Sequence, residues 1–280
     1  MLKKIVGILS VLFCIVLLTV YNAREVNTKQ LKIREETIPS EKIKDDQNGF
    51  LIAYFSDVCY GSYIDEEILQ KAGSIIDSYA PDLIIFGGDL LDQSEMDVAP
   101  ETVNMLKEFL SGLDAPFGKF AVMGDRDCNN EDILQEIYDA SEFMLLRNES
   151  RMIGSDKDDL IVIAGIDPFV QEKPPYTQLL ADDQHFSIVV THYPDLFLEL
   201  ERCRFDLCLA GHSLGGQIYL PIINLFQREY GCQKYYHGRS KKDGHILDIT
   251  NGIGRRKTDA RLWADAEIVF YNLKSVHSGE

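Results

Sequence analysis

The chain begins with an apolar run, and after it hydrophobic residues follow two patterns: short continuous runs, and single positions spaced three or four residues apart. The run at 5–21 contains no charged residue, and a charged stretch follows it. Farther on, short runs rich in isoleucine, valine and phenylalanine predict buried β-strands, because β-branched and aromatic side chains fit a pleated sheet. Between them, apolar positions spaced three or four residues apart predict amphipathic helices. Strands that alternate with helices, and later follow one another directly, predict an α/β (α+β) fold with sheets covered by helices.

The predicted elements cover most of the chain after residue 49. Strands are predicted for the apolar runs at 50–55, 83–86, 119–123, 143–146, 160–164, 186–190, 205–209, 217–220, 244–250 and 267–273. Helices are predicted where the spacing is helical, at 66–79, 100–113, 131–140, 176–182 and 194–201. We divide the chain into an anchor or signal segment at 1–23, a charged stalk at 24–48, a domain at 49–275 and a tail at 276–280. Leu31 and Ile33 in the stalk indicate an additional edge strand.

The N-terminal run has a length between those of two classes of membrane-targeting segment. A bilayer-spanning helix needs about 17–25 apolar residues, so the run at 5–21 is short for a span. Signal-peptide cores hold about 7–15 residues, so the run is long for a cleaved signal. Because Tyr21-Asn22-Ala23 is a poor cleavage site, we expect an uncleaved single-pass anchor in the cell membrane. Lys3 and Lys4 would then stay in the cytoplasm and the domain would lie outside, whereas cleavage would release a secreted protein.

Charge and cysteine content narrow the function further. The chain has 28 Lys and Arg against 45 Asp and Glu, which gives a formal net charge of -17. So acidic a protein repels a phosphate backbone, and we therefore expect no nucleic-acid partner. The six cysteines include no CxxC pair, which argues against a zinc ribbon. Cys203 and Cys208 would form a disulfide only if the fold brought them together. The sequence leaves the oligomeric state open.

Chemically active side chains gather directly after the predicted strands. In α/β folds, binding and catalytic residues commonly lie at the carboxyl ends of strands. Gly87 and Gly88 precede one of these residues and let the backbone turn sharply there. The residues that share this position are Asp57, Cys59, Asp89, Asp125, Arg126, His192 and His212. Carboxylate and imidazole groups together suit divalent Mn, Fe or Zn, so the pattern predicts a metal site assembled from loops.

The five motifs resemble those of the calcineurin-like metallophosphoesterases, and most closely those of a membrane-anchored bacterial branch. That family carries D-x-H, G-D-x-x-D, G-N-H-D, a single H and G-H-x-H in this order, and the branch adds G-G-Q. The matching stretches here are D-V-C at 57–59, G-D-L-L-D at 88–92, G-D-R-D at 124–127, His192, and G-H-S-L-G-G-Q at 211–217. The resemblance runs from about residue 50 to the C-terminus. It implies a two-layer β-sandwich of mixed sheets, flanked by helices, with two metal ions at one edge.

The resemblance also implies that the first metal position has lost ligands. Asp57 and Asp89 match two of the family's ligands there, and Asp89 matches the one that bridges both metals. Cys59 and Leu214, however, stand where the family has histidines. Leucine cannot coordinate a metal. Cys59 is either a thiolate ligand or a small buried apolar residue.

The second metal position keeps a full set of ligands under the same resemblance. Its members are Asp89, Asp125, His192 and His212, with Asp125 in place of the family's asparagine. A carboxylate should hold a cation more firmly than an amide, although Asp125 has the alternative of pairing with Arg126. We therefore expect one sound metal site and a second, doubtful one.

Arginines replace or join the expected catalytic groups. Arg126 stands where the family has its catalytic histidine, and arginine cannot give up a proton near neutral pH. It either clamps phosphate oxygens bidentately or forms an ion pair with Asp127 or Asp125. Arg255 and Arg256 either reach an anionic substrate or form a solvated charge run. Binding of a phosphate group is thus better preserved than its cleavage.

Three functions follow from these observations. The first is a metal-dependent phosphoesterase at the outer face of the membrane. It would hydrolyse a phosphomonoester, a phosphodiester or a lipid-linked pyrophosphate at an altered, single-metal site. The second is a catalytically impaired pseudoenzyme that binds metal or a phosphorylated ligand without turnover. The third is a partner domain that uses the fold as a scaffold. Metal content separates the third from the others, and turnover separates the first from the second.

Overall fold

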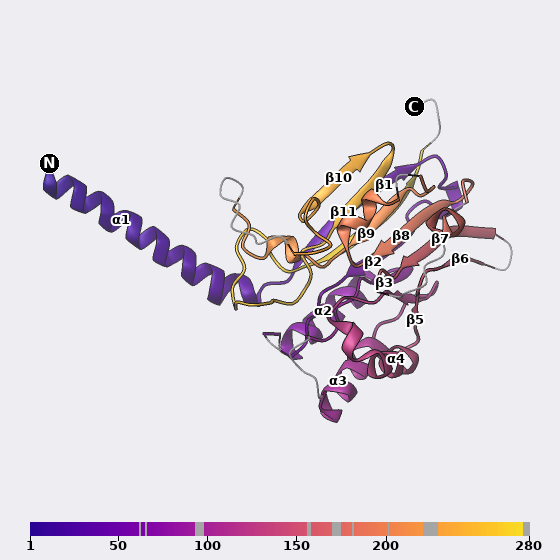
Figure 1. Cartoon of the computed structure of the whole chain (residues 1–280), viewed down its shortest axis with the longest axis horizontal. Coiled ribbons are helices and arrows are strands. Elements are labelled where there is room, and N and C mark those ends of the chain that lie inside the picture. Colours follow the sequence, from indigo (N-terminus) through magenta and orange to yellow (C-terminus); the bar gives the residue numbers. More distant parts are fainter. Residues whose placement is uncertain are drawn as a thin grey trace.

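Two six-stranded mixed sheets form the core of the protein, as a computed structural model of the chain shows (Figure 1). The structure describes residues 1–61, 63–64, 66–92, 98–155, 158–169, 175–180, 182–200, 202–220 and 229–276. The first sheet has the strand order β1-β12-β2-β3-β4-β5, and the second has the order β10-β11-β9-β8-β7-β6. This arrangement confirms the predicted two-layer sandwich of mixed sheets.

Most strands coincide with the predicted apolar runs. The first sheet consists of β1 (Lys32–Ser40), β2 (Leu51–Phe55), β3 (Leu83–Phe86), β4 (Lys119–Ala121), β5 (Phe143–Leu145) and β12 (Glu267–Ser275). The second consists of β6 (Glu149–Ser155), β7 (Asp158–Ile166), β8 (Phe186–Thr191), β9 (Leu207–Ala210), β10 (Gly238–Lys242) and β11 (His245–Ile249). The α-helices are α1 (Leu2–Tyr21), α2 (Glu66–Tyr79), α3 (Pro100–Ser111), α4 (Glu131–Ala140) and α5 (Tyr176–Leu179). Short π- and 3-10-helical turns are η1 (Asn22–Val26), η2 (Asn27–Lys29), η3 (Asp45–Gln47), η4 (Asp127–Asn129), η5 (Pro194–Leu198) and η6 (Leu214–Gly216).

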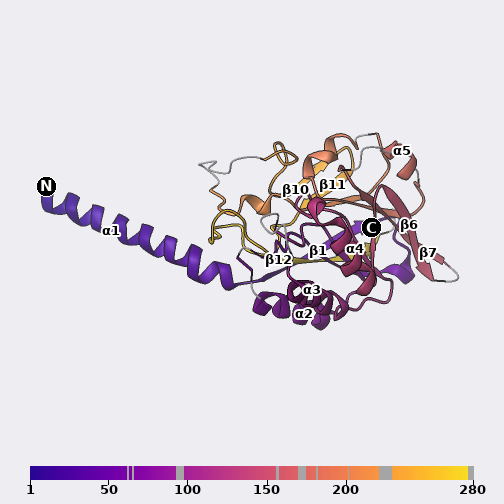
Figure 2. The same cartoon turned by 60° about the horizontal axis from the view of Figure 1, so that its bottom comes forward.

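Both faces of the first sheet are buried at its centre. In β2, Ile52 and Tyr54 pack into the layer between the sheets, whereas Ala53 and Phe55 pack against the helices α2, α3 and α4. Successive side chains of a strand point to opposite faces, so a strand buried on both faces needs an unbroken apolar run. Figure 2 shows α2 and α3 side by side along the first sheet. The rigid layers hold the strand ends, and hence the loops after them, in place.

The second sheet is covered on its outer face by irregular structure. Val189 of β8 and Cys208 of β9 pack there against Leu196 and Phe197 of η5. Cys203 lies in the same apolar cluster, and both it and Cys208 are free thiols. These two cysteines therefore behave as small buried apolar residues, and their pairing is excluded in this structure.

Several predicted elements differ from those observed. The structure has no strand at 217–220, where a single bridge between Ile218 and Leu262 replaces it. Gln217 has a positive φ of 53°, so the chain turns away from an extended path there. The predicted helix at 194–201 is the 3-10 turn η5 within its described part. The strands β6 and β10 were not predicted, because β10 is a polar edge strand with partly exposed side chains. The predicted tail lies, apart from Val276, outside the described residues.

The N-terminal helix α1 projects from the domain as a single rod (Figure 1). None of its residues is buried, and its length and composition make it a candidate membrane span, a test that a signal sequence also passes. After it, β1 pairs in parallel with β12, so part of the stretch 24–48 is the edge strand of the first sheet. The Arg261 N–H also donates a 2.8 Å hydrogen bond to the Ala23 carbonyl. The segment after α1 is thus attached directly to the domain.

Candidate metal centre

The carboxyl ends of parallel strands from both sheets meet at one edge of the sandwich. Strands β2, β3 and β4 are parallel in the first sheet, as are β8 and β9 in the second. The residues that follow these five strands in turn are Asp57, Asp89, Asp125, His192 and His212. Asp57, Asp89 and His212 have positive φ values of 52°, 59° and 67°, a region that side chains other than glycine rarely adopt. Such local strain marks residues whose orientation the surrounding structure imposes.

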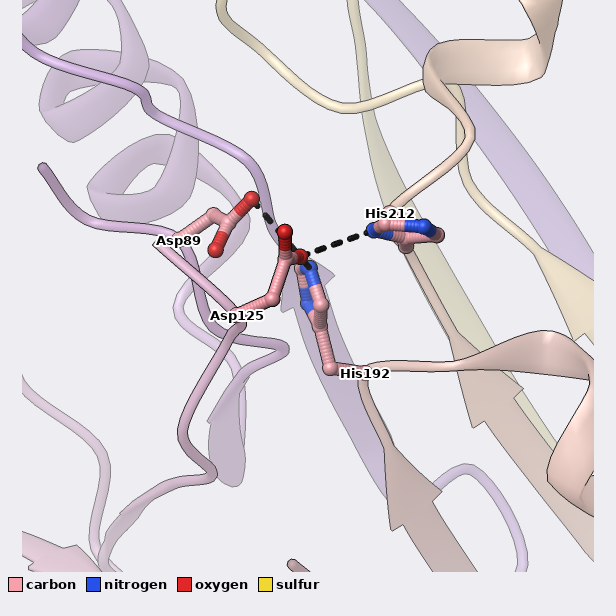
Figure 3. Close-up of side chains that lie close together, drawn as sticks. All are labelled: Asp89, Asp125, His192 and His212. Carbon is pink, nitrogen blue, oxygen red and sulfur yellow. Dashed lines mark ion pairs between the residues drawn. The ribbon is translucent and has the colours of Figure 1, made fainter. Parts of the chain in front are cut away.

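His192 is oriented by the loop that carries Asp89. Its Nδ1 lies 2.7 Å from the Gly87 carbonyl, which can only accept, so Nδ1 donates and carries the ring proton. The lone pair of Nε2 then faces inward, 3.2 Å from Asp89 Oδ2 and 3.2 Å from Asp125 Oδ1 (Figure 3). The imidazole is thus presented to two carboxylates through its unprotonated nitrogen.

His212 is oriented in the same way from the other sheet. Its Nε2 lies 2.9 Å from the Tyr230 carbonyl and therefore donates to it. The remaining nitrogen, Nδ1, faces Asp125 Oδ1 at 2.9 Å (Figure 3). Outer hydrogen bonds of this kind fix the tautomer of histidines that bind metals in proteins.

Four buried acceptor atoms therefore converge with no donor between them. Asp89 Oδ2, Asp125 Oδ1, His192 Nε2 and His212 Nδ1 all lack a hydrogen-bond partner among the described residues, and they lie within 4.8 Å of one another. Buried acceptor atoms whose lone pairs point at one another are costly in free energy, unless a cation lies between them and accepts those lone pairs. The donor set of two carboxylates and two imidazoles fits a divalent transition metal.

The charges of the group respond to this crowding. Burial opposes the charged form of His192, but the carboxylates of Asp89 and Asp125 outweigh burial and raise the pKa of His192 well above its usual value. Burial likewise opposes ionisation of Asp125, but the His192 and His212 rings beside its carboxyl lower the pKa of that carboxyl. The pocket thus attracts positive charge, which a bound cation would provide in place of a proton.

Asp127 holds the two acidic loops together. Its carboxylate accepts hydrogen bonds from the N–H groups of Asp89 at 2.8 Å, Leu90 at 2.9 Å and Gly124 at 2.9 Å. It is fully buried, and burial together with the charge of Asp89 raises its pKa to about 7. Sequence reasoning considered this residue only as a partner for Arg126. The final aspartate of the G-D-R-D motif was the available signal for its positioning role.

Comparison with known proteins agrees with this architecture. The model of the calcineurin-like phosphoesterase family matches residues 50–216, which is more than half of the chain. The chain belongs to the calcineurin-like phosphoesterase family. This phosphoesterase-family chain is 30% identical over 260 residues to the uncharacterized metallophosphoesterase YkuE of Bacillus subtilis, covering 91% of this chain and 90% of that one. The uncharacterized protein YpbG of the same organism is 29% identical over 269 residues, covering 94% of each chain.

A more distant relative has a defined activity in its name. The UDP-2,3-diacylglucosamine pyrophosphatase LpxG of Chlamydia trachomatis is 24% identical over 225 residues, covering 62% of this chain and 66% of that one. Members of the family use divalent metals, and the four convergent residues of this chain fit such an ion. The recognised family thus agrees with the chemistry that the buried acceptors demand.

The first metal position of the family is poorly equipped in this chain. Asp57, Cys59 and Asp89 offer ligand atoms within 4.8 Å of one another. Burial, and then the charge of Asp89, raise the pKa of the Cys59 thiol well above its usual value, which disfavours a thiolate. Leu214 and Asp57 are both buried, and both side chains lie against Gly252. A Cβ added at Gly252 would lie 2.7 Å from Asp57 Cβ and 3.0 Å from Leu214 Cδ2. This group does not fit a metal ion as the four-residue group does.

Arg126 has a different partner from those expected. Its Nη1 donates a 2.8 Å hydrogen bond to Asp92 Oδ1, and its Nε lies 3.6 Å from Asp89 Oδ2. The alternative of an ion pair with Asp127 or Asp125 is wrong, because Arg126 pairs with Asp92 instead. Asp127 accepts hydrogen bonds from backbone N–H groups, and Asp125 lies against the two histidines. The guanidinium nevertheless lies at the rim of the centre, with a partly exposed side chain.

Arg255 and Arg256 are buried rather than part of a solvated charge run. Arg255 Nε donates to Asp259 Oδ1 at 2.8 Å, and its Nη1 donates to the Thr28 carbonyl at 2.8 Å. Arg256 donates to the His212 carbonyl, and its Nη1 lies 3.7 Å from Asp89 Oδ2. The interpretation as a solvated run failed because two adjacent arginines, taken locally, indicate a surface loop, and only the fold places this loop against the carboxylates.

An aromatic pocket adjoins the centre. The rings of Tyr193 and His212 lie 4.6 Å apart, and those of Tyr193 and Tyr230 lie 5.6 Å apart. A cavity of about 370 Å³ is lined by these two tyrosines together with Phe169 and Leu196, among others. It offers apolar walls within reach of a group bound at the metal centre.

Proposed function

We propose that this protein binds one divalent cation, Mn, Fe or Zn, between Asp89, Asp125, His192 and His212, and hydrolyses a phosphorylated substrate there. The convergence of four buried acceptor atoms without a donor carries this proposal. Asp57 borders the site, and Cys59 is left outside the proposed ligand set because burial, and then the charge of Asp89, raise the pKa of its thiol. Membership of a phosphoesterase family supports the reaction class.

The residues of the chain share the chemical work at this centre. A divalent cation held there would polarise a phosphoryl oxygen and lower the pKa of water. Asp89 and Asp125 would balance its charge, while the Gly87 and Tyr230 carbonyls hold the two histidines in the ligating tautomer. Arg126, in place of the family histidine, would clamp phosphoryl oxygens through its partly exposed guanidinium.

The loss of a proton donor at Arg126 favours one class of leaving group. An arginine cannot protonate a departing oxygen, so an alkoxide would leave poorly. A phosphate leaving group carries its negative charge without that proton. We therefore propose a pyrophosphate linkage as the preferred substrate over simple alkyl phosphomonoesters and phosphodiesters.

The N-terminal helix indicates where such a substrate would be met. We propose that residues 1–23 anchor the domain of residues 49–275 in the membrane, with the domain on the outer face because of Lys3 and Lys4. A lipid-linked pyrophosphate is then the preferred substrate, and the pocket formed by Tyr193 and Tyr230 would receive the group attached to it. The name of the distant relative LpxG, a pyrophosphatase of a diacylated sugar nucleotide, agrees with this choice.

A second candidate function is binding without turnover. The Arg126–Asp92 ion pair favours it, because it engages the guanidinium that would otherwise be available to a phosphoryl group. In that case the centre would hold metal or a phosphorylated ligand at the membrane surface.

Metal content measured together with turnover tests both functions. The full chain would be purified in detergent, loaded with Mn²⁺, and analysed by mass spectrometry for metal and by phosphorus NMR for cleavage of a lipid-linked pyrophosphate and of bis(p-nitrophenyl) phosphate. One metal ion with turnover supports the phosphoesterase, and one without turnover supports the binding protein. A metal-free chain would refute both proposals.

Matched histidine variants show whether the metal sits where we place it. His192→Ala should abolish metal binding, because it removes a ligand at the carboxyl end of β8. His185→Ala serves as the control, because His185 precedes the same strand and pairs with Asp182 instead. Equal metal content in the two variants would contradict the proposed site.

A further inference from the structure

A second group of acidic side chains lies next to the metal centre and faces an arginine. Asp57 and Asp89 belong to this group, together with the Cys59 thiol. The Arg256 guanidinium is buried beside them, with Nη1 3.7 Å from Asp89 Oδ2. Within the described part of the chain, neither this Nη1 nor Asp57 Oδ1 has a hydrogen-bond partner. A buried positive charge therefore faces the carboxylates that the family resemblance assigns to the first metal.

We propose that Arg256 supplies here the positive charge that a first metal would supply, so that the centre holds a single metal ion. The inference rests on the proposed function, because it presupposes a cation at the four-residue group. It adds that the active centre pairs one metal ion with one fixed guanidinium.

The surroundings of Arg256 hold its guanidinium in place. The Arg256 backbone N–H donates to Gln217 Oε1 at 2.8 Å, and the Gln217 amide donates in turn to the Thr258 carbonyl at 2.7 Å. Its Nη2 donates to the His212 carbonyl and lies 3.8 Å from Glu229 Oε2. Contacts at both the backbone and the head group leave the side chain little freedom to withdraw.

The loop that carries Arg256 is packed tightly against the Asp57 turn. The Gly254 N–H donates to the Asp57 carbonyl at 2.7 Å. A Cβ at Gly254 would lie 2.2 Å from the Val58 carbonyl oxygen, so only glycine allows this approach. The guanidinium is thus a built part of the centre, delivered by a loop shaped for that contact.

A second cation beside Asp57 and Asp89 would be repelled by nearby arginines and would find too few ligand atoms. Asp89 Oδ2 already faces Arg126 Nε at 3.6 Å and Arg256 Nη1 at 3.7 Å. Charges of the same sign repel strongly in a buried site, where the effective dielectric constant is low. Leu214 offers no donor atom in place of the family histidine. The guanidinium instead adds fixed positive charge for phosphoryl oxygens without the need for ion binding.

Restoration of the missing ligands, with and without the arginine, tests this inference. Mn²⁺ stoichiometry would be measured by mass spectrometry and titration calorimetry on the full chain. The wild type and the Cys59→His/Leu214→His variant should both bind one equivalent, because Arg256 still excludes a second ion. Addition of Arg256→Gln to that variant should raise the stoichiometry to two, with the spin-coupled resonance signal of a manganese pair. Addition of Arg255→Gln instead is the control and should leave it at one.

Each outcome decides between separate explanations. Two equivalents in the Cys59→His/Leu214→His variant with Arg256 intact would overturn the inference, as would one equivalent in a folded triple variant. Zero equivalents in the wild type would overturn the proposed function itself. Arg256→Gln alone offers a second measurement should the triple variant not fold. It should tighten the binding of the single Mn²⁺ at least about threefold by removing nearby positive charge, and unchanged or weaker binding would count against the inference.

Discussion

Removal of the Asp127 carboxylate is the perturbation that the structure defines most sharply. This buried side chain accepts three short hydrogen bonds, from the N–H groups of Asp89, Leu90 and Gly124. Asp127→Ala leaves these three donors without their acceptor while the backbone around them stays buried. Since two of the donors lie in the loop of Asp89 and the third in the loop of Asp125, both loops lose their connection.

The size of the effect follows from the number of donors. A buried donor without a partner costs about 1–3 kcal/mol, so three such donors cost roughly 3–9 kcal/mol. The substitution also relieves the burial of a carboxyl whose pKa is raised to about 7, which offsets part of this cost. We therefore expect the low end, a loss of about 3 kcal/mol in the free energy of unfolding. For a domain of this size that corresponds to a fall of about 6–12 °C in Tm.

Thermal and urea unfolding of the metal-free full chain measure this loss. Asp127→Asn should lose less, about 1–2 kcal/mol, because one oxygen remains to accept while the amide group faces a donor. Asp132→Asn is the matched control, since Asp132 is exposed in the first turn of α4 and should change stability little. Metal affinity should also fall about 10–100-fold in Asp127→Ala, as it does when groups that orient ligands are removed. A loss below about 1 kcal/mol would refute the view that Asp127 joins the two loops.

Three further predictions concern the centre itself. Asp125→Asn restores the family's residue but removes a charge, so the Kd for Mn²⁺ in calorimetry should rise at least about tenfold, or about 1.4 kcal/mol, with one ion still bound; tighter binding would contradict the role of the carboxylate. Tyr230→Ala keeps the backbone carbonyl that orients His212 and should raise KM for a lipid-linked pyrophosphate roughly 2–10-fold with kcat unchanged, because an aromatic contact is worth about 0.5–1.5 kcal/mol; a fall in kcat alone would argue against a binding role. With free Mn²⁺ at a hundred times its Kd, removal of the metal by EDTA should lower the free energy of unfolding by about 2.7 kcal/mol and Tm by about 5–10 °C. An unchanged Tm would contradict binding of the ion to the folded protein.

Local sequence determined the strands and the residues that follow them. The apolar runs at 50–55 and 83–86 predicted β2 and β3, because a strand buried on both faces tolerates no polar interruption. The parallel arrangement then placed Asp89, Asp125, His192 and His212 at one edge. The predicted family and the predicted two-layer fold were both confirmed. They could be predicted because the order of motifs can be read from the sequence without knowledge of side-chain packing. That the four residues bind metal stays a prediction.

The partners of the buried charges were decided by the tertiary structure alone. No local pattern shows that Arg126 pairs with Asp92, that Arg256 lies against Asp89, or that Asp127 collects backbone N–H groups from two loops. An ion pair depends on which loops meet in space, and the chain between Asp89 and Arg256 folds through both sheets before they meet. The sequence by itself thus predicted a metal-binding edge, and only the packing of the loop at 252–256 against the Asp57 turn showed that a buried arginine lies against Asp89 there.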